Sequence, residues 1–599
     1  MLVFVVVLLA SFALSAPTAI DTQNNVTYNG LTRNGLDVFL GIRYAEDTSG
    51  ENRFKPPRPH TPASGSMVNA NSYGAACPQP PNSFAPPLTL TNITKTSEDC
   101  LNLNIIRPNG TLPASKLPVL VFIHGGSFWT GSNQEITTSP DGLIIQSIEA
   151  GLPIIHVALN YRLGGEKLLV VQNQTNLAQL SASLNPPPSR TNVPKMLVSV
   201  INVSPLSGSG ITLHSLEETH RRSQFMDNRQ EVRGQLVTDS PLTVTGLAIG
   251  MQTLAFGGDQ PVPFQQGICE SQALEPGITG NFTIVQMQLL ADATGCNTTD
   301  LNSDETIACL RQLDTDTIAQ ASFDTYVADI AHNIGDSWLP VVDGDFLPAP
   351  PSQLLAEGRF ANVTTMILWV ESDMQYYTPM DITTEQDTYD FVASYLPGFT
   401  NLSVQDILTL YPSSDFQDNT AANHTREFYR SARLFRDVIM TCQPIGYGEH
   451  LARMGNQVYL VDQNQTLLSP ILASLGSPGL GPVHTSEFAY TFGNISHYNV
   501  SGYPFNPTAE DYRLQRQEAR SWAAFASVGQ PSLYTKDTLQ GFEPAFTKPN
   551  ETAVFVAGGG DEGLSTFDGP GSRPGLAAQK LRSRCGFINS PSIIPQLQY

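Results

Sequence analysis

The chain has 599 residues, of which 41% are hydrophobic and 14% charged, and its 54 acidic and 32 basic side chains give a net charge of -22. This composition is typical of a folded globular protein with a large core, and it excludes disordered, collagen-like and low-complexity chains. The excess of acid repels phosphate polymers and anionic lipid, so we expect no nucleic-acid partner and no binding to membranes through basic residues.

The first segment, residues 1–15, is typical of a secretory signal peptide. Its apolar run, MLVFVVVLLASFALSA, is shorter than the ~20 residues that a membrane-spanning helix needs. Cleavage after Ser15 puts small side chains at both positions that the peptidase reads, Ala13 and Ser15. No later stretch is apolar for long enough to anchor the chain, so we expect a secreted, extracellular protein without stable membrane insertion.

Glycosylation sequons of the form Asn-x-Ser/Thr recur along the chain, at a density expected of an exported glycoprotein. Their asparagines include Asn25, Asn92, Asn109, Asn281, Asn297, Asn362, Asn401, Asn423, Asn464, Asn494, Asn499 and Asn550.

The seven cysteines of a secreted chain predict disulfide bonds and one remaining thiol. Two pairs close short loops, Cys77 with Cys100 and Cys296 with Cys309. A third pair could join Cys442 to Cys585 in the distant C-terminal segment, which leaves Cys269 as a buried thiol in the apolar stretch FQQGICESQA. The alternative is that these thiols are small core residues.

Short apolar runs alternate with helical stretches after the first hundred residues. The runs are LPVLVFIHGG (117–126), LPIIHVALNYRLG (152–164), NVTTMILWV (362–370) and GNQVYLVDQ (455–463), and a helical stretch is REFYRSARLFRDVI (426–439). This alternation predicts an α/β protein in which helices cover both faces of a mostly parallel sheet. Pro-rich stretches read as surface loops and none is a convincing linker, so we predict one domain over residues 16–599.

The run from Leu117 ends in His124 and a glycine-rich turn formed by Gly125, Gly126 and Ser127. Glycine lets backbone N–H groups turn toward a cavity, which is what an oxyanion hole requires. On these residues alone, an ordinary glycine-rich turn is an equal alternative.

Several further motifs stand around this turn. They are GIRYA from residue 41, RFKPP from residue 53, SEDCLNLN from residue 97, ALNYRLG from residue 158 and PVVDGDFLP from residue 340. Together they resemble the type-B carboxylesterases and lipases, in particular the secreted fungal branch. The resemblance implies an α/β-hydrolase fold with a Ser-acid-His triad, an ester of a small molecule or lipid as substrate, and no metal or organic cofactor.

The same resemblance implies two of the three catalytic residues. The stretch LWVESDMQYYTP from residue 368 matches the family's acid loop, with Asp373 where Glu is usual and Glu371 as the competing candidate. The stretch GPVHTSEFAYTFG from residue 481 matches the family's histidine loop, which makes His484 the general base and Glu487 a supporting residue packed behind it.

The nucleophile is missing from the chain. No Gly-x-Ser-x-Gly occurs in it, and the family resemblance disappears over residues 166–245 before it returns at LAIGMQTLAFGG from residue 247. A divergent insertion and a catalytically dead homologue are two explanations, and a shifted reading frame is a third.

The genetic code favours the shifted frame. In the shifted frame, each codon is read from the third base of the codon before it. The last base of Met226 (ATG) and the first two bases of Asp227 (GA-) then form GGA, which encodes glycine. In the same way, Asp227 and Asn228 (AA-) form a glutamine codon unless they form a stop codon. The next steps permit Ser, Ala and Gly as far as Glu231, which spells a hidden elbow, Gly-Gln-Ser-Ala-Gly. Upstream, the same frame permits Val-Thr-Ile-Tyr, and before it other stretches that resemble the family.

The return to the given frame can be explained by an unspliced intron. Its donor could be written at Val232-Arg233, its branch point at Thr238-Asp239 and its acceptor at Thr245-Gly246. We therefore expect that residues 166–245 mix intron with out-of-frame exon and pack poorly. The central strand that leads to the elbow should then be missing or improvised.

The sequence thus predicts a serine carboxylic ester hydrolase whose chain as given is inactive. The alternative is a binding protein on the same fold, against which the retention of His484 and Asp373 argues. Esterase and lipase are not distinguished, because the lid loops near residues 77–100 do not reveal the acyl-chain length.

Overall fold

The computed structural model describes residues 16–79, 87–165, 202–205, 211–214, 234–239, 245–298, 300–301, 303–329 and 338–599. The predicted signal peptide and the residues of the hidden elbow lie outside this described part. So do most of the anomalous residues 166–245, and their expected poor packing stays a prediction.

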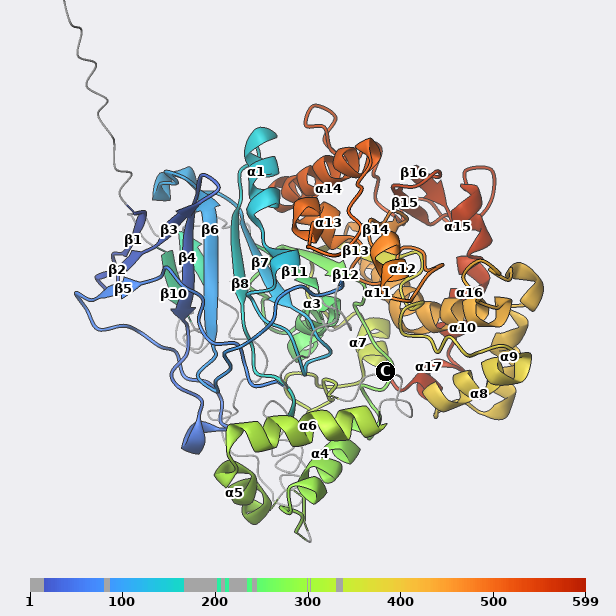
Figure 1. Cartoon of the computed structure of the whole chain (residues 1–599), viewed down its shortest axis with the longest axis horizontal. Helices are drawn as coiled ribbons and strands as arrows, with labels where there is room; N and C mark the ends of the chain where they lie inside the picture. The colour runs from blue at the N-terminus through green and yellow to red at the C-terminus, as the bar shows by residue number, and fades with distance from the viewer. Residues whose placement is uncertain are drawn as a thin grey trace, which may run out of the picture.

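One large sheet runs through the molecule (Figure 1). From edge to edge its strands are β16 (Gly563–Thr566), β15 (Ala553–Ala557), β14 (Val458–Gln463), β13 (Thr364–Val370), β12 (Gln266–Glu270), β11 (Gly234–Asp239), β7 (Val119–His124), β8 (Ile155–Leu159), β6 (Asn102–Pro108), β4 (Leu36–Arg43) and β3 (Leu31–Arg33). The strands from β15 to β8 pair in parallel, and both margins pair antiparallel. The predicted mostly parallel sheet is confirmed, as are the four strands expected from the apolar runs.

The residues of β7 alternate between two hydrophobic cores. Val119, Val121 and Ile123 belong to one core, whereas Leu120 and Phe122 belong to the other. Because successive side chains of a strand point to opposite faces, every residue of such a central strand is buried and both faces need a cover.

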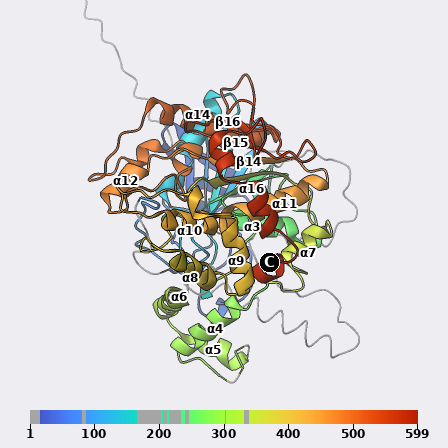
Figure 2. The ribbon, with the colours of Figure 1, turned by 90° about the vertical axis from the view of Figure 1, so that its right-hand side faces the viewer.

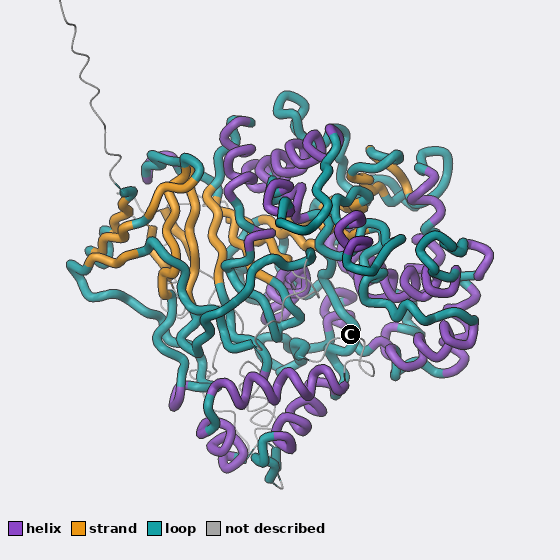
Figure 3. Tube along the Cα trace, in the orientation of Figure 1, coloured by secondary structure: helices purple, strands orange, loops and turns teal. Residues whose placement is uncertain are grey.

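Helices supply that cover on both faces, as predicted. In Figures 1 and 2, α14 (Ala509–Val528) lies above the sheet and α3 (Thr245–Leu254) below it. α1 (Asp141–Glu149) and α13 (Phe488–Thr491) pack with α14, and α11 (Cys442–Arg453) and α7 (Pro351–Ala356) lie on the side of α3. Figure 3 shows this sheet as one band of strands enclosed by helices and loops.

Other elements extend the structure at its margins. The helices are α4 (Phe282–Ala293), α5 (Asp304–Gln312), α6 (Thr315–Asp329), α8 (Glu385–Tyr395), α9 (Asn401–Thr409), α10 (Arg426–Arg436), α12 (Ser469–Ser474), α15 (Pro574–Ala578), α16 (Leu581–Ile588) and α17 (Ile594–Leu597). The strands are β1 (Thr18–Asp21), β2 (Val26–Asn29) and β5 (Met67–Asn69) in one small sheet, and β9 (Asn202–Pro205) and β10 (Ile211–His214) in another.

The long helix α14 illustrates how the local sequence sets an element. Thr508 caps its first turn, where the Thr508 hydroxyl accepts from the backbone N–H of Asp511 and the Asp511 carboxylate accepts from the N–H of Thr508. Gly529 ends the helix in the left-handed conformation, with φ of 73°. Between these caps, Leu514, Trp522 and Phe525 face the sheet.

A strand occupies the central slot between β7 and β12. β11 pairs in parallel with β7 from Gly234↔Val119 to Asp239↔His124 and with β12 from Gln235↔Gln266 to Thr238↔Cys269. Of the two expectations for the central strand, missing or improvised, the first is wrong: the slot is filled, by residues that we had assigned to noncoding sequence. α3 follows it at Thr245, as the helix after a nucleophile elbow does.

Three disulfides join the cysteine pairs that the sequence had favoured or left open. They are Cys77–Cys100, Cys296–Cys309 and Cys442–Cys585, and Cys269 is a buried free thiol. Within the described ranges, no helix is both long and apolar enough to cross a bilayer.

The close approach of α3 to the loop after β12 predicts the effect of one substitution. A Cβ at Gly250 would lie 1.8 Å from the carbonyl oxygen of Ala273. We expect Gly250→Ala to lower the free energy of unfolding by about 1–3 kcal/mol, because the backbones must move apart. Urea denaturation measures the free energy of unfolding.

The matched control is Gly586→Ala in α16, where an added Cβ meets no atom within 4 Å. It should stabilise the protein by about 0.5–1 kcal/mol, and equal effects of the two variants would contradict the packing argument.

Candidate active site

The candidate site lies where the parallel strands end at their C-terminal edge. His124 ends β7, Ser271 follows β12 directly, Asp373 follows β13, and His484 lies in the loop beyond β14 and α12. Loops that follow neighbouring parallel strands meet at one edge of the sheet, which is where α/β proteins bind their ligands.

His484 and Asp373 form a buried pair. The Nδ1 atom of His484 lies 2.6 Å from Oδ1 of Asp373, and neither side chain is exposed. The backbone fixes the partners further, because the N–H of His484 donates to the Asp373 carbonyl at 3.2 Å and the N–H of Val370 donates to Oδ2 at 3.0 Å. An imidazole held this way by a carboxylate has a defined tautomer and orientation.

Glu371, the competing acid, points to other partners. Its carboxylate pairs with Arg433 and accepts from the hydroxyl of Ser372. Burial alone would raise the pKa of Glu371, but Arg433 and Arg436 bring that pKa below its ordinary value. The geometry therefore favours Asp373 as the partner of His484.

The glycine-rich turn after β7 has the strained backbone expected of a loop that presents N–H groups. Gly126 has φ of 114°, and a Cβ there would lie 2.1 Å from the Thr130 carbonyl oxygen. Ser127 and Phe128 also have positive φ values of 49° and 60°, which side chains rarely adopt. The turn is closed by N–H groups of Trp129 and Thr130 that donate to the Gly126 carbonyl.

His124, at the start of this turn, is a packing residue. Its ring stacks on Tyr161 with centroids 4.6 Å apart, and Nδ1 lies 2.8 Å from the Gly125 carbonyl oxygen. Burial lowers the pKa of His124 to about 4, although the bond to Gly125 opposes that change. The imidazole is therefore neutral at ordinary pH and supports the turn.

Ser271 is a site residue that the sequence analysis missed. Its hydroxyl lies 3.3 Å from Nδ1 of His484, its side chain is fully buried, and its φ of 83° is unusual for serine. It contacts the same ring nitrogen that Asp373 binds, whereas a serine nucleophile works with the opposite nitrogen, Nε2. Ser271 is therefore placed to orient the ring rather than to attack a substrate. Its position directly after a buried strand could have identified it.

Behind His484 lies a group of buried glutamates that the sequence did not predict as a cluster. Glu270 accepts from the indole N–H of Trp522 at 2.6 Å, and Glu487 and Glu518 are fully buried. Burial raises the pKa of Glu487 to about 8; Glu270 and Asp373 add to this increase, and His484 opposes it. Burial, Glu487 and Glu270 likewise hold the pKa of Glu518 well above its ordinary value. The pKa values of Glu487 and Glu518 are thus raised by burial and by the repulsion between neighbouring carboxyl groups.

The described part of the chain contains no group of three or more His, Cys, Asp or Glu side chains that could hold a metal ion.

Comparisons with known proteins bear on the family and the fold. The chain matches a model of the "Carboxylesterase family" over residues 23–165 and 251–558, so the unmatched gap coincides with the anomalous segment. Among solved structures, EstA of Aspergillus niger superposes with a TM-score of 0.69 at 19% identity and covers 98% of this chain and 99% of its own, which supports the α/β-hydrolase fold.

Two similar relatives differ in what their names say. A secreted lipase of Arthroderma benhamiae is 42% identical over 598 residues, covering 100% of this chain and 99% of its own length. An inactive carboxylesterase-like protein of Byssochlamys spectabilis is 30% identical over 609 residues, covering 96% of this chain and 94% of its own length.

The raised pKa of Glu487 predicts how stability depends on pH. The folded chain holds this proton up to about pH 8, whereas a free glutamate loses it near 4.3. Stability should therefore fall between these pH values as pH rises, with a limit of ~1.4 kcal/mol per pH unit from this group. Glu487→Gln should remove this contribution. The difference in stability between variant and parent should therefore favour the variant more at pH 8 than at pH 5.

Urea denaturation at both pH values measures the difference. The glutamates at positions 270 and 518, Asp373 and His484 also face this group and remain in the variant. Glu510→Gln, on the exposed side of α14, is the control and should leave the pH dependence unchanged. Parallel curves for Glu487→Gln and the parent would contradict the prediction.

Proposed function

Because the chain belongs to the carboxylesterase family, we propose that its gene encodes a secreted serine esterase or lipase, whose catalytic serine the chain as given lacks. The observation that carries the proposal is the buried His484–Asp373 pair, with 2.6 Å between Nδ1 and Oδ1. The strained Gly125–Ser127 turn, one strand slot away from the loop of Ser271, supplies the second part of the same machinery.

The mechanism is acyl transfer to water. A serine on the turn between the central strand and α3 attacks the ester carbonyl while Nε2 of His484 takes its proton, and that proton then passes to the departing alcohol. Water, activated by the same imidazole, releases the acid and restores the serine. Asp373 holds the imidazole and stabilises its cation. Backbone N–H groups at Gly126 and Ser127, with that of the residue after the serine, bind the oxyanion.

The serine is the one in the hidden elbow. In the correctly spliced product, the Val-Thr-Ile-Tyr of the shifted frame takes the central slot, and Gly-Gln-Ser-Ala-Gly-Gly follows it and joins α3 at Leu247. This helix is suited to the junction, because a Cβ at Gly246 would overlap the Gln272 carbonyl oxygen at 1.3 Å. Glycine at this position allows the backbone of α3 to lie this close to the loop after β12.

The second candidate is a catalytically inactive binding protein on the same fold. It is favoured by the absence of Gly-x-Ser-x-Gly from the chain as given and by the similarity to a relative named as inactive. Against it stands the preserved His484–Asp373 geometry, which a binding role does not need.

The chain as given should lack esterase activity above the small residual rate that an oxyanion turn alone provides. We would express the 599-residue chain, assay a short-chain aryl ester, and treat the protein with an organophosphonate that labels activated serines. The similar Arthroderma lipase serves as the positive control for the assay. Stoichiometric labelling of a serine in the present chain would overturn the missing-nucleophile reading.

The transcript decides between the two candidates. The spliced messenger should lack the bases that encode Val232 to Thr245 and a second stretch between Gly165 and Lys195. Sequencing of cDNA across this region tests both deletions. A messenger that encodes residues 166–245 as given, with no shorter form, makes the binding protein the better proposal.

The acid is tested by substitution in the spliced protein. Asp373→Asn should lower turnover by about 10³–10⁴-fold, because an amide presents the wrong partner to His484 Nδ1. Glu371→Gln keeps a hydrogen-bonding group opposite Arg433, and it should leave turnover within a few-fold of the parent. Steady-state kinetics at saturating ester compare the two variants, and the reverse ranking would assign the acid role to Glu371.

A further inference from the structure

The residues expected to bind the oxyanion lie directly against Thr130 and Gly131. A Cβ at Gly126 would lie 2.1 Å from the Thr130 carbonyl oxygen, and a Cβ at Gly131 would lie 2.2 Å from the Gly125 carbonyl oxygen. Two stretches of backbone this close cannot shift independently, because no free space lies between them. The position of Thr130 and Gly131 therefore sets the position of the Gly125–Ser127 turn.

The side chain of Gln79, from another segment of the chain, holds Thr130 and Gly131. Its Oε1 atom accepts from the backbone N–H of Gly131 at 3.0 Å and from the Thr130 hydroxyl at 2.8 Å. Its Nε2 atom donates to the Gly131 carbonyl at 2.9 Å. A carboxamide offers a donor and an acceptor side by side, so it satisfies both backbone groups of Gly131 in the way that a neighbouring strand would.

Gln79 is itself held in place. Its side chain is 7% exposed, and Nε2 also donates to the Cys77 carbonyl at 3.1 Å. A disulfide joins Cys77 to Cys100, and the Cys100 carbonyl accepts from the amides of Asn102 at 2.8 Å and Asn160 at 3.3 Å. Asn102 begins β6 and Asn160 follows β8, so the segment of Gln79 is attached to the large sheet.

This attachment gives a physical role to two sequence motifs outside the candidate triad. Asn102 belongs to SEDCLNLN and Asn160 belongs to ALNYRLG. β8 pairs with β7, and β7 leads into the Gly125–Ser127 turn. The same sheet therefore holds the turn twice, directly through β7 and indirectly through Gln79.

We propose that Gln79 positions the oxyanion hole of the esterase. It keeps Thr130 and Gly131 in place, so that the backbone N–H groups of Gly126 and Ser127 stay directed at the oxygen of the substrate. Gln79 touches no substrate and is therefore a positioning residue. The inference rests on the proposed function, because these N–H groups have this task only where an ester is attacked.

The test in the spliced protein replaces Gln79 by leucine, which has a similar volume and no hydrogen-bonding groups. The N–H groups of the turn bind the substrate oxygen most strongly once it carries negative charge. Gln79→Leu should therefore lower kcat/KM for a short-chain aryl ester by about 10–10²-fold. The inhibition constant of the corresponding aryl ether, which binds without forming an oxyanion, should stay within about threefold of the parent value.

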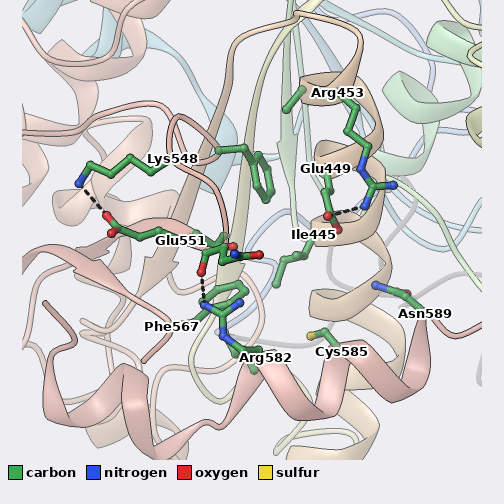
Figure 4. Close-up of a pocket in the computed structure, with 15 residues that line it drawn as sticks. Ile445, Glu449, Arg453, Lys548, Glu551, Phe567, Arg582, Cys585 and Asn589 are labelled. Atoms are coloured by element: carbon green, nitrogen blue, oxygen red, sulfur yellow. Dashed lines mark hydrogen bonds and ion pairs between the residues drawn. The ribbon is translucent and has the colours of Figure 1, made fainter. Parts of the chain in front are cut away.

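A second measurement needs no catalysis. Hydrogen exchange of the 599-residue chain, followed by mass spectrometry, should show that the backbone N–H groups of residues 125–131 exchange faster in Gln79→Leu than in the parent. The helices α11 and α16 line a separate cavity of about 520 Å³, shown in Figure 4, whose lining includes neither Gln79 nor residues 125–131. Peptides of these two helices should exchange at the parent rate, which shows that the variant is folded.

Gln596→Leu is the matched control. The half-buried Gln596 side chain also joins two backbone groups, since it accepts from the N–H of Thr400 at 3.0 Å and donates to the Ser592 carbonyl at 2.8 Å. Its loss should leave kcat/KM within about twofold of the parent value and exchange over residues 125–131 unchanged.

A further variant tests the contact itself. Thr130→Val removes one of the hydrogen bonds that Gln79 makes to this stretch, so it should lower kcat/KM less than Gln79→Leu does. In the double variant the two losses should not add, because both remove the same contact.

Three results would overturn the inference while leaving the esterase proposal intact. They are a parent-like kcat/KM for Gln79→Leu, parent-like exchange over residues 125–131, and an equal loss of ether binding, which would indicate a distorted pocket rather than displaced donors. A spliced parent that does not hydrolyse the ester would overturn both proposals, and the rate of the parent itself separates this outcome from the other three.

Discussion

The slot between β7 and β12 is the constraint on which the rest of the site depends. The strand there must pair with both neighbours, and it must end between the Gly125–Ser127 turn and the loop of Ser271. The residues that follow that strand therefore lie between these two loops. The backbone of β11 meets the pairing requirement, since hydrogen bonds of a ladder depend little on side chains. The chemistry depends on the next few residues, and for these the side chain is decisive.

The polar interior around His484 is compatible with folding, because its carboxyl groups are either paired or shifted toward their uncharged form. A buried carboxylate is costly unless it is paired, and Asp373 is paired with the imidazole and a backbone N–H. Behind it, burial raises the pKa values of Glu487 and Glu518. The raised pKa values favour the uncharged form of these two glutamates, which reduces the repulsion between carboxylates around the Asp373–His484 pair.

Several features of the fold followed from local patterns. The strands of the central sheet were identifiable because both of their faces are buried, which requires continuous apolar runs such as those at 117–126 and 362–370. The acid was ambiguous, because Glu371 and Asp373 follow the same strand two residues apart and lie in the same run of turns. The choice between them came from Arg433, which is distant in sequence and attracts Glu371.

By itself, the sequence predicted the sheet and its helical cover, and it showed that the elbow motif is absent from the given frame. These features are encoded in periodicity and in contiguous motifs. Only the tertiary structure decided that Ser271 touches His484, that Glu270, Glu487 and Glu518 gather behind it, and that Gly234–Asp239 fill the central slot. The physical reason is that contacts between separate strands and helices depend on how the chain packs, and a buried glutamate looks in sequence like one exposed to solvent.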